Sequence, residues 1–184
     1  TIYNKIFQTL ISTSDMQTAE ITKLFENVFR SINIGLVNEM KKICHKMNMN
    51  IHEIINAAST KPYGYFKFLP GPGLGGHCIP IDPFYLSWKA KKYNLDAEFI
   101  SLAGKINRSM PAWVISRISD FLRKKGKKIS NKTKILILGV AYKKNINDMP
   151  DISTKFCSYP DGMDRSAIKT FMNPKNKNGN KRRN

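Results

Sequence analysis

The feature that most constrains the fold is a long apolar repeat at helical spacing in the first quarter of the chain. Ser14, followed three residues later by Gln17, has the form of a capping box and predicts a helix start. From about residue 15 to 46, apolar side chains then recur every three or four positions, as on one buried helix face. The repeat consists of Ile21, Leu24, Phe25, Val28, Ile32, Leu36, Met40 and Ile43. Such a helix would be about 48 Å long, so we expect it to cross a large assembly or to pack against a partner chain.

Further helices are expected on both sides of a loop. A short helix should cover residues 51–58. Residues 61–83 contain five glycines and five prolines, so we expect no regular element there. Helix should resume at about Pro83, because proline is favourable in a first turn. Another helix is expected over residues 97–123, broken or bent near Pro111.

The pattern changes after the charged link at residues 123–134. Residues 135–140 read ILILGV, a compact apolar run that predicts a buried parallel strand at the start of an α/β unit. The expected fold is therefore mainly α. We expect a helical domain over residues 1–124, the truncated start of an α/β domain over 125–158, and a disordered basic tail over 159–184.

Positive charge is concentrated in the last third of the chain. Residues 123–184 hold 17 Lys and Arg against 4 Asp and Glu, a balance of +13 out of the net +18. Nucleic-acid binding is one interpretation of such a region. A solvated Lys- and Asn-rich surface is the other, and it is favoured because no aromatic residues interleave with the terminal basic run.

Cysteine, histidine and hydropathy patterns restrict the class of protein. The three cysteines are Cys44, Cys78 and Cys157. Their odd number and wide spacing make a poor disulfide framework and fit a reducing compartment. No apolar run reaches the roughly 18 residues of a membrane span, and the sequence opens without a signal-peptide pattern, so we expect a cytoplasmic location by default. The neighbouring Cys and His residues match no short zinc pattern, and no metal site is expected.

The segment PGPGLGGHCIPIDP at residues 70–83 carries the clearest chemical signal. Its glycines let the backbone approach a ligand and present amide N–H groups. Cys78 follows them directly and precedes an expected helix start, and both features favour a reactive thiolate. Asp82, four residues later, is available to orient water or a proton. The alternative is a buried structural cysteine beside a rigid turn.

Lys23 and Asn27 lie four residues apart on the long helix and share a face. A lysine and an amide side by side can hold a developing oxyanion or a water molecule. The alternative is an ordinary exposed face, which such a pair indicates by default.

Several long motifs occur in one order along the chain. They are AEITKLFEN at residues 19–27 with Asn33 and Asn38-Glu39, TKPYG at 60–64, the segment at 70–83, YLSW at 85–88, and LGVAYK at 138–143 with Asn147-Asp148. In these motifs, over roughly residues 1–150, the chain resembles the UDP-glucose/GDP-mannose dehydrogenase family. The form GPGLGGHCIPIDP is similar to the branch that oxidises UDP-N-acetylhexosamines for surface polysaccharides.

The resemblance implies a fold and an activity. It implies a helical central domain of the 6-phosphogluconate-dehydrogenase-like type that forms a homodimer through the helix at residues 15–46, followed by an incomplete Rossmann-like UDP-binding domain. Family members oxidise C6 of a UDP-sugar, such as UDP-glucose or a UDP-N-acetylhexosamine, from alcohol to uronic acid with two NAD.

The resemblance also implies roles for individual residues. Cys78 would attack the intermediate aldehyde and pass through a thiohemiacetal and a thioester. Asp82 and Lys23 would activate the hydrolytic water and stabilise oxyanions, and Asn27 would hold the same water or the sugar. The residues expected to line the nucleotide-sugar pocket are Phe68, Gly75, Tyr142 and Lys143.

The sequence departs from the family pattern at both ends. Nothing in the chain matches the N-terminal NAD-binding domain of the family, so its cofactor-binding residues are unknown. Residues 150–153 read PDIS where the family has Arg-Glu-Ser-Pro, and nothing matches from residue 156 onward. We therefore expect a fragment that is inactive by itself. The competing hypothesis is a non-enzymatic helical dimerisation or basic nucleic-acid-binding protein.

Overall fold

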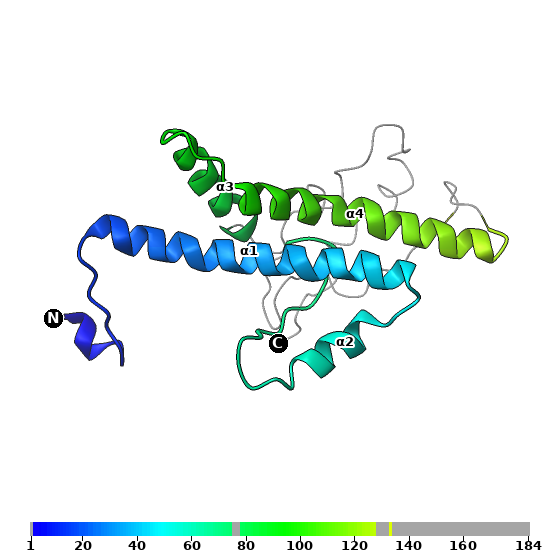
Figure 1. The fold of residues 1–184 in the computed structure, drawn as a ribbon, viewed down its shortest axis with the longest axis horizontal. Helices are drawn as coiled ribbons and strands as arrows, with labels where there is room; N and C mark the ends of the chain where they lie inside the picture. Colours follow the sequence, from blue (N-terminus) through cyan, green and yellow to red (C-terminus); the bar gives the residue numbers. More distant parts are fainter. Residues whose placement is uncertain (1, 75–77, 128–132, 134–184) are drawn as a thin grey trace, which may run out of the picture. The chain divides into compact units, whose positions relative to one another are not determined.

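The computed structural model describes residues 2–74, 78–127 and 133 and divides the chain into two units, Thr1–Arg108 and Ser109–Asn184. A short 3-10 helix, η1, covers Ile2–Lys5. Four α-helices follow, as Figure 1 shows: α1 (Met16–Lys46), α2 (Ile51–Ala58), α3 (Cys78–Lys91) and α4 (Glu98–Lys124). The described residues contain no strand, and the expectation of a mainly helical protein is confirmed for them.

The predicted long helix is confirmed as α1, but its cap differs from the prediction. Asp15, not Ser14, is the N-cap, and its Oδ1 accepts from the Thr18 backbone N–H at 2.7 Å. A carboxylate next to the positive end of a helix is a better acceptor than the neighbouring hydroxyl. This backbone hydrogen bond, more than any other interaction, lowers the pKa of Asp15. The helix ends at Lys46, and Asn48 follows with a positive φ of 57°, the left-handed conformation that often terminates a helix.

The buried face of α1 is not the predicted apolar stripe. Four members of that stripe, Ile21, Phe25, Leu36 and Ile43, are exposed. Small and amide side chains take much of the buried face instead. The buried residues of α1 are Asn27, Val28, Ser31, Gly35, Val37, Asn38 and Cys44. Apolar periodicity located the helix correctly, but within this chain only part of the stripe is buried, because neighbouring helices approach over small residues of α1.

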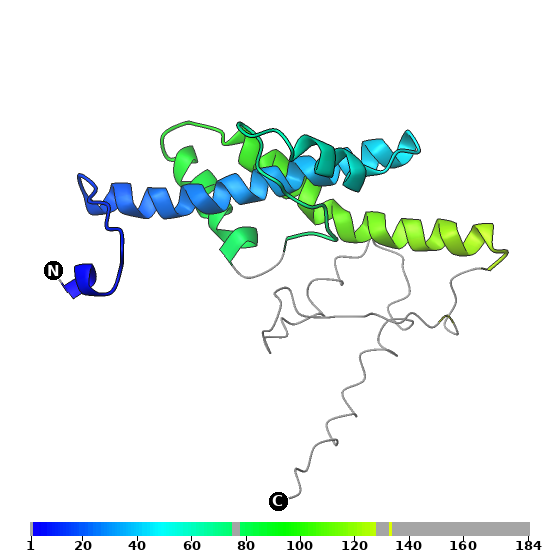
Figure 2. The same ribbon diagram turned by 90° about the horizontal axis from the view of Figure 1, so that it is seen from below.

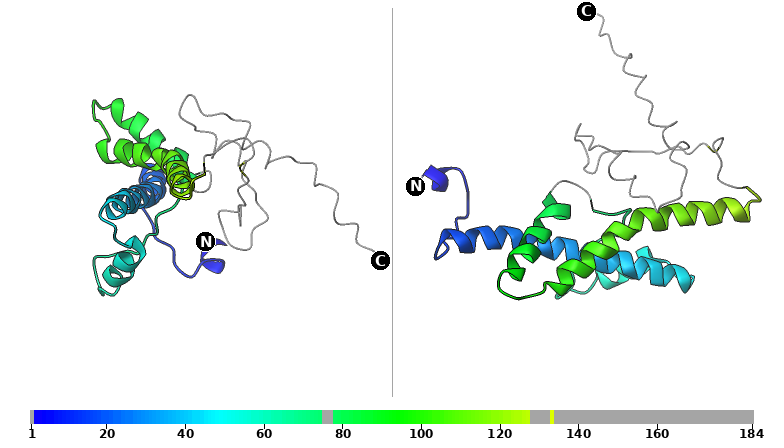
Figure 3. Two further views of the ribbon diagram at one scale, coloured as in Figure 1. Left: turned by 90° about the vertical axis from the view of Figure 1, so that its right-hand side faces the viewer. Right: turned by 90° about the horizontal axis from the view of Figure 1, so that it is seen from above.

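A compact apolar core joins α1 to α2. It consists of Val37, Cys44, Ile51 and Ile55, with Met40, Ile54 and Phe68 packed against it. The helix α2 matches its predicted range, and the Asn50 side chain caps it by accepting from the His52 backbone N–H at 3.0 Å. Viewed along α1, α2 lies on one side and α3 with the start of α4 lies on the other (Figure 3).

The helix α3 begins at Cys78, five residues before the predicted start, so the prediction of a loop through residue 83 is wrong at its end. Pro80 lies in the first turn, where a missing N–H removes no helical hydrogen bond. Pro83 lies deeper in the helix and is fully buried, so packing offsets the hydrogen bond that its ring removes. Figure 2 shows α3 crossing α1, which brings the first turn of α3 to the middle of the long helix.

The contact between α1 and α4 depends on a small residue. A Cβ placed on Gly35 would lie 3.2 Å from both Cα and Cβ of Ala103, so the two helices approach at a glycine. The prediction for α4 is confirmed to within one residue at each end, and the helix passes through Pro111 without a break. The strand expected at residues 135–140 and the domain limits beyond residue 127 lie outside the described residues.

Candidate functional site

Cys78 is the first residue of α3, and its thiol is free and exposed. The alternative of a buried structural cysteine does not hold, whereas the free thiol of Cys44 is buried in the core. Asp82 lies one turn further along α3 and is partly buried. Residues four apart on a helix share a face, so the thiol and the carboxylate lie on the same side of α3.

Asn27 of α1 holds the Asp82 carboxylate. Its Nδ2 donates to Asp82 Oδ2 at 2.7 Å, although the two residues are 55 positions apart. The Asn27 side chain is buried, with 1% of the residue exposed, and its Oδ1 accepts a hydrogen bond from Arg30 Nη2. Arg30 thus fixes which end of the amide faces Asp82. We call Arg30, Asn27, Asp82 and Cys78 the cysteine cluster.

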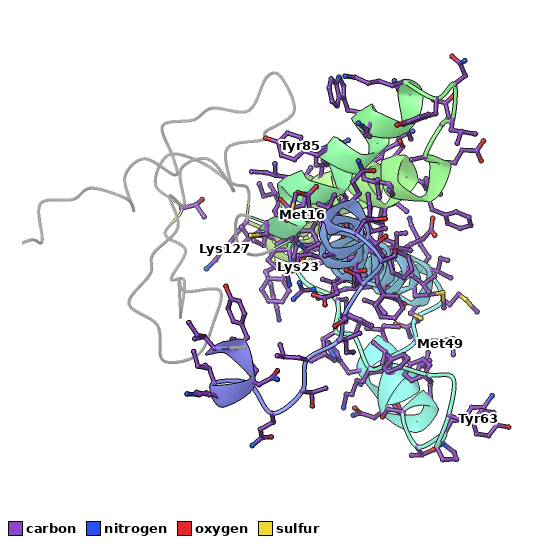
Figure 4. The ribbon with its side chains drawn as sticks, turned by 90° about the vertical axis from the view of Figure 1, so that its left-hand side faces the viewer. Met16, Lys23, Met49, Tyr63, Tyr85 and Lys127 are labelled. Atoms are coloured by element: carbon purple, nitrogen blue, oxygen red, sulfur yellow. The ribbon has the colours of Figure 1, made fainter. Side chains whose placement is uncertain are left out.

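Lys23 does not join Asn27 as the sequence predicted. Its ammonium donates to Glu26 Oε2 at 2.7 Å, and the Lys23 side chain is 68% exposed. Figure 4 labels Lys23 on α1. Because Glu26 accepts this hydrogen bond and lies beside the lysine charge, its pKa is lowered. Lys23 and Asn27 are one turn apart on α1, but one lies at the surface and the other in the interior. The expected role of Lys23 at an oxyanion stays a prediction.

Phe68 is the described member of the expected substrate pocket. Its ring is partly buried, packs against the α1–α2 core and meets Phe29 edge-on with 5.9 Å between ring centroids. Phe66 contacts the same Phe29 ring at 5.8 Å. The other three expected pocket residues, Gly75, Tyr142 and Lys143, lie outside the described residues, so their roles also stay predictions.

A second polar cluster on α1 is centred on two buried asparagines. Asn38 Nδ2 donates to Asn107 Oδ1 at 2.9 Å, and Asn107 Nδ2 donates to the Ser31 carbonyl oxygen at 3.0 Å. The free oxygen of Asn38 accepts from the Gly71 backbone N–H at 2.9 Å. We call Ser31, Asn38, Gly71 and Asn107 the amide cluster. It connects α1, α4 and the glycine loop (described residues 70–74) that leads towards Cys78.

Sequence reasoning missed three residues of these clusters. Arg30 follows Asn27 by three positions, so helical spacing could have suggested it. Asn38 follows Asn27 by about three turns and therefore shares its face. Asn107 carried no such signal, because its partner Asn38 is 69 positions away.

The described residues provide no site for a metal or a dinucleotide. They contain no group of three or more His, Cys, Asp or Glu side chains that could hold a metal ion. A dinucleotide site of the Rossmann type needs a strand, a glycine turn and a helix, and the described part of the chain has no strand. In addition, none of the described helices is both long enough and apolar enough to cross a membrane.

Comparisons with known proteins agree on one group of enzymes. Residues 17–109 match the central domain of the UDP-glucose/GDP-mannose dehydrogenase family. The chain is 40% identical over 154 residues to the UDP-N-acetyl-D-mannosamine dehydrogenase of Methanococcus maripaludis. It is 35% identical over 136 residues to the NDP-N-acetyl-D-galactosaminuronic acid dehydrogenase of Ralstonia solanacearum. These matches cover 84% and 74% of this chain.

A solved structure gives the same result. The structure of the UDP-N-acetyl-mannosamine dehydrogenase Cap5O from S. aureus superposes with a TM-score of 0.65 at 32% identity over 84% of this chain. The matched region is only part of each relative: 34% of the M. maripaludis protein, 30% of the Ralstonia protein and 35% of the solved chain. The chain therefore spans about a third of the length of the relatives it matches.

Proposed function

Because the chain belongs to the UDP-glucose/GDP-mannose dehydrogenase family, we propose that it supplies the catalytic-cysteine part of an NAD-dependent nucleotide-sugar 6-dehydrogenase. The observation that carries this proposal is the arrangement of the cysteine cluster. An exposed thiol at a helix N-terminus lies one turn from a carboxylate that a buried asparagine holds in place. This combination suits covalent catalysis followed by hydrolysis.

Cys78 is the proposed nucleophile. The N–H groups in the first turn of α3 lack intrahelical acceptors, and the positive end of the helix dipole lies there. Both features stabilise a thiolate. The sulfur would bond to the aldehyde carbon of the substrate, the carbonyl electron pair would move to oxygen, and a proton would complete a thiohemiacetal. A hydride acceptor outside the described residues would take the hydride from the adduct carbon, and loss of the hydroxyl proton would then leave a thioester on Cys78.

Asp82 is the proposed base for hydrolysis of the thioester. It would accept a proton from water as the water attacks the thioester carbon, which releases the uronic acid and the Cys78 thiol. Asn27 is too deeply buried to offer a broad contact surface, so its proposed role is to fix the Asp82 carboxylate through the 2.7 Å hydrogen bond. Lys23 would stabilise an oxyanion only after leaving Glu26, and exposed ion pairs of this kind are weak.

NAD would accept the hydrides of both oxidation steps, but the described residues do not fit it. They contain no strand, which a dinucleotide site of the Rossmann type requires. We therefore assign no described residue to the cofactor and derive no step from it.

The proposed substrate is a UDP-N-acetylhexosamine, with UDP-glucose as the other family substrate. The proposal is based on the substrate after which the M. maripaludis and S. aureus relatives are named, UDP-N-acetylmannosamine. Phe68, Gly75, Tyr142 and Lys143 remain the residues proposed to line the pocket.

The proposed partner is a second copy of the chain. Ile21, Phe25, Leu36 and Ile43 are exposed at helical spacing along α1, and an apolar stripe of this kind favours helix packing. The double substitution Phe25→Glu with Leu36→Glu should convert a dimer into a monomer in analytical ultracentrifugation. A monomer before substitution would contradict the proposed partner.

A chimera tests the enzymatic proposal. Residues 17–109 would replace the corresponding segment of the M. maripaludis relative, and NADH formation from UDP-N-acetylmannosamine would be followed by absorbance. We expect sustained NADH formation from the chimera and from its Cys44→Ala variant, but no sustained turnover to the uronic acid from Cys78→Ala, because the thiol is needed from the aldehyde onward. A folded chimera that forms no NADH, or a Cys78→Ala chimera that forms it at the same rate, would contradict the proposal.

A further inference from the structure

The amide cluster joins parts of the chain that are far apart in sequence. Asn38 lies on α1, Asn107 on α4, and Gly71 in the glycine loop, 33 positions from Asn38. Both asparagines are buried, with 0% of Asn38 and 3% of Asn107 exposed. Buried polar groups of this kind need internal partners, and each asparagine uses both its amide nitrogen and its oxygen.

The direction of these hydrogen bonds makes Asn38 specific. Its nitrogen must donate to α4, which leaves its oxygen to accept from the loop. An apolar side chain could fill the same space between the helices but could not hold the Gly71 N–H. Asn38 therefore does more than pack α1 against α4, because it fixes one backbone position of the loop.

The loop also passes close to α4 at its next glycine. A Cβ on Gly73 would lie 3.6 Å from the Asn107 carbonyl oxygen, and Gly73 has a φ of +142° that other residues rarely adopt. Two glycines, two residues apart, thus follow a path set by the asparagines of the amide cluster. The chain reaches Cys78 only five residues after Gly73, so this path limits how it enters α3.

We infer that Asn38 is a positioning residue, which fixes the glycine loop through the Gly71 N–H and thereby sets the environment of the Cys78 thiol. Its importance for catalysis rests on the proposed function, but its effects on the loop and on the thiol do not. The amide cluster thus acts as the support for the cysteine cluster, although no atom of Asn38 contacts Cys78.

The experiment uses the full chain and two readouts. Hydrogen exchange followed by NMR reports on the Gly71 amide, and mass spectrometry reports the rate and pH profile of Cys78 alkylation by iodoacetamide. Asn38→Ala is compared with Asn33→Ala, the same change on the same helix at a side chain that donates only to the Phe29 carbonyl oxygen. Circular dichroism verifies that helix content is unchanged.

We expect the Gly71 amide of the unmodified chain to exchange at least about tenfold more slowly than an unstructured amide. Asn38→Ala should remove this protection and slow Cys78 alkylation at least about threefold, with its pH profile moving towards that of an unstructured thiol. Asn33→Ala should change neither readout.

Three results would overturn the inference. One is an unprotected Gly71 amide in the unmodified chain, a measurement that does not depend on whether Asn38→Ala folds. Another is a Gly71 amide that stays protected in Asn38→Ala. The third is a Cys78 rate and pH profile that stay unchanged when Gly71 loses protection, which would make Asn38 a loop anchor only. The proposed dehydrogenase activity fails by a different result, sustained NADH formation at an unchanged rate without Cys78.

Discussion

The two polar clusters of α1 are built alike but end differently. Each is centred on a buried asparagine, Asn27 or Asn38, and the two are about three turns apart on one helix face. In the amide cluster every hydrogen bond has a buried asparagine side chain as a partner, and only the Gly71 backbone is partly exposed. The cysteine cluster instead runs outward, from buried Asn27 to partly buried Asp82 and to the exposed thiol of Cys78.

This difference suggests a structural role for the amide cluster and a chemical role for the cysteine cluster. A closed network in the interior has no group left for a ligand, so it contributes rigidity and specific geometry. An open network offers its last groups to whatever binds at the surface. The comparison predicts that substitutions in the amide cluster mainly affect stability, and that substitutions at the open end of the cysteine cluster mainly affect reactivity.

The largest effect on stability is expected in the amide cluster. Asn107→Leu would leave the Asn38 amide nitrogen without its acceptor and would remove the side-chain donor to the Ser31 carbonyl oxygen, which keeps only its hydrogen bond within α1. Each unsatisfied buried group costs about 1–3 kcal/mol, so we expect the free energy of unfolding to fall by about 2–4 kcal/mol in urea titrations. Asn56→Leu, at an exposed amide that accepts from Lys67, should change it by less than about 0.5 kcal/mol. Equal losses in the free energy of unfolding for Asn107→Leu and Asn56→Leu would contradict a structural role for the amide cluster.

A somewhat smaller loss is expected where the helices are closest. Gly35→Leu would place side-chain atoms against Ala103, where even a Cβ would lie at 3.2 Å. Overpacking of this kind costs about 1–3 kcal/mol, and it would also separate Asn38 from Asn107. Urea unfolding measures the loss, with Asn33→Leu on the same helix as the control. A fully stable Gly35→Leu variant would show that the amide cluster does not require this close approach.

Asp82→Asn should separate reactivity from stability. An asparagine at this position can still accept from Asn27 Nδ2, so we expect a stability change below about 1 kcal/mol. It cannot act as a base, and single-turnover hydrolysis by the chimera should slow by about 10²-fold. If Asp82→Asn strongly lowered the free energy of unfolding but left the hydrolysis rate unchanged, Asp82 would have a structural role and not a catalytic one.

The smallest effect is expected at the N-cap of α1, outside both clusters. The folded pKa of Asp15 lies below its ordinary value of 3.8 because the carboxylate accepts from Thr18. Its contribution is therefore present above pH 3.8 and is lost as the pH falls through the lower, folded pKa. Asp15→Ala should remove this pH dependence and fray about one turn of α1, which hydrogen exchange at the Thr18 amide would detect. A Thr18 amide equally protected in both proteins would contradict this assignment.

The sequence was sufficient for the elements that depend on local patterns. Apolar periodicity located α1, α2 and α4 to within one residue, and a glycine-rich segment followed by Cys78 identified the reactive region. The start of α3 was misjudged, because two prolines were given more weight than the burial of Pro83 in the packed helix.

The remaining features depend on contacts between distant parts of the chain. The buried face of α1 is formed largely by Asn27, Ser31, Gly35 and Asn38, which a search for apolar side chains does not select. The pairing of Asn38 with Asn107 follows from the close approach at Gly35, a property of the folded chain. Lys23 was expected beside Asn27 because the two are four residues apart, but Asn27 is buried and the Lys23 side chain is exposed.

The most direct test of the account concerns the thiol at the open end of the cysteine cluster. The alkylation rate of Cys78 by iodoacetamide at pH 7 would be measured in the folded chain and in a peptide of residues 74–84. The account predicts that the folded chain reacts at least about tenfold faster, because the helix N-terminus and the fixed loop stabilise the thiolate. A folded-chain rate equal to or below that of the peptide would contradict it.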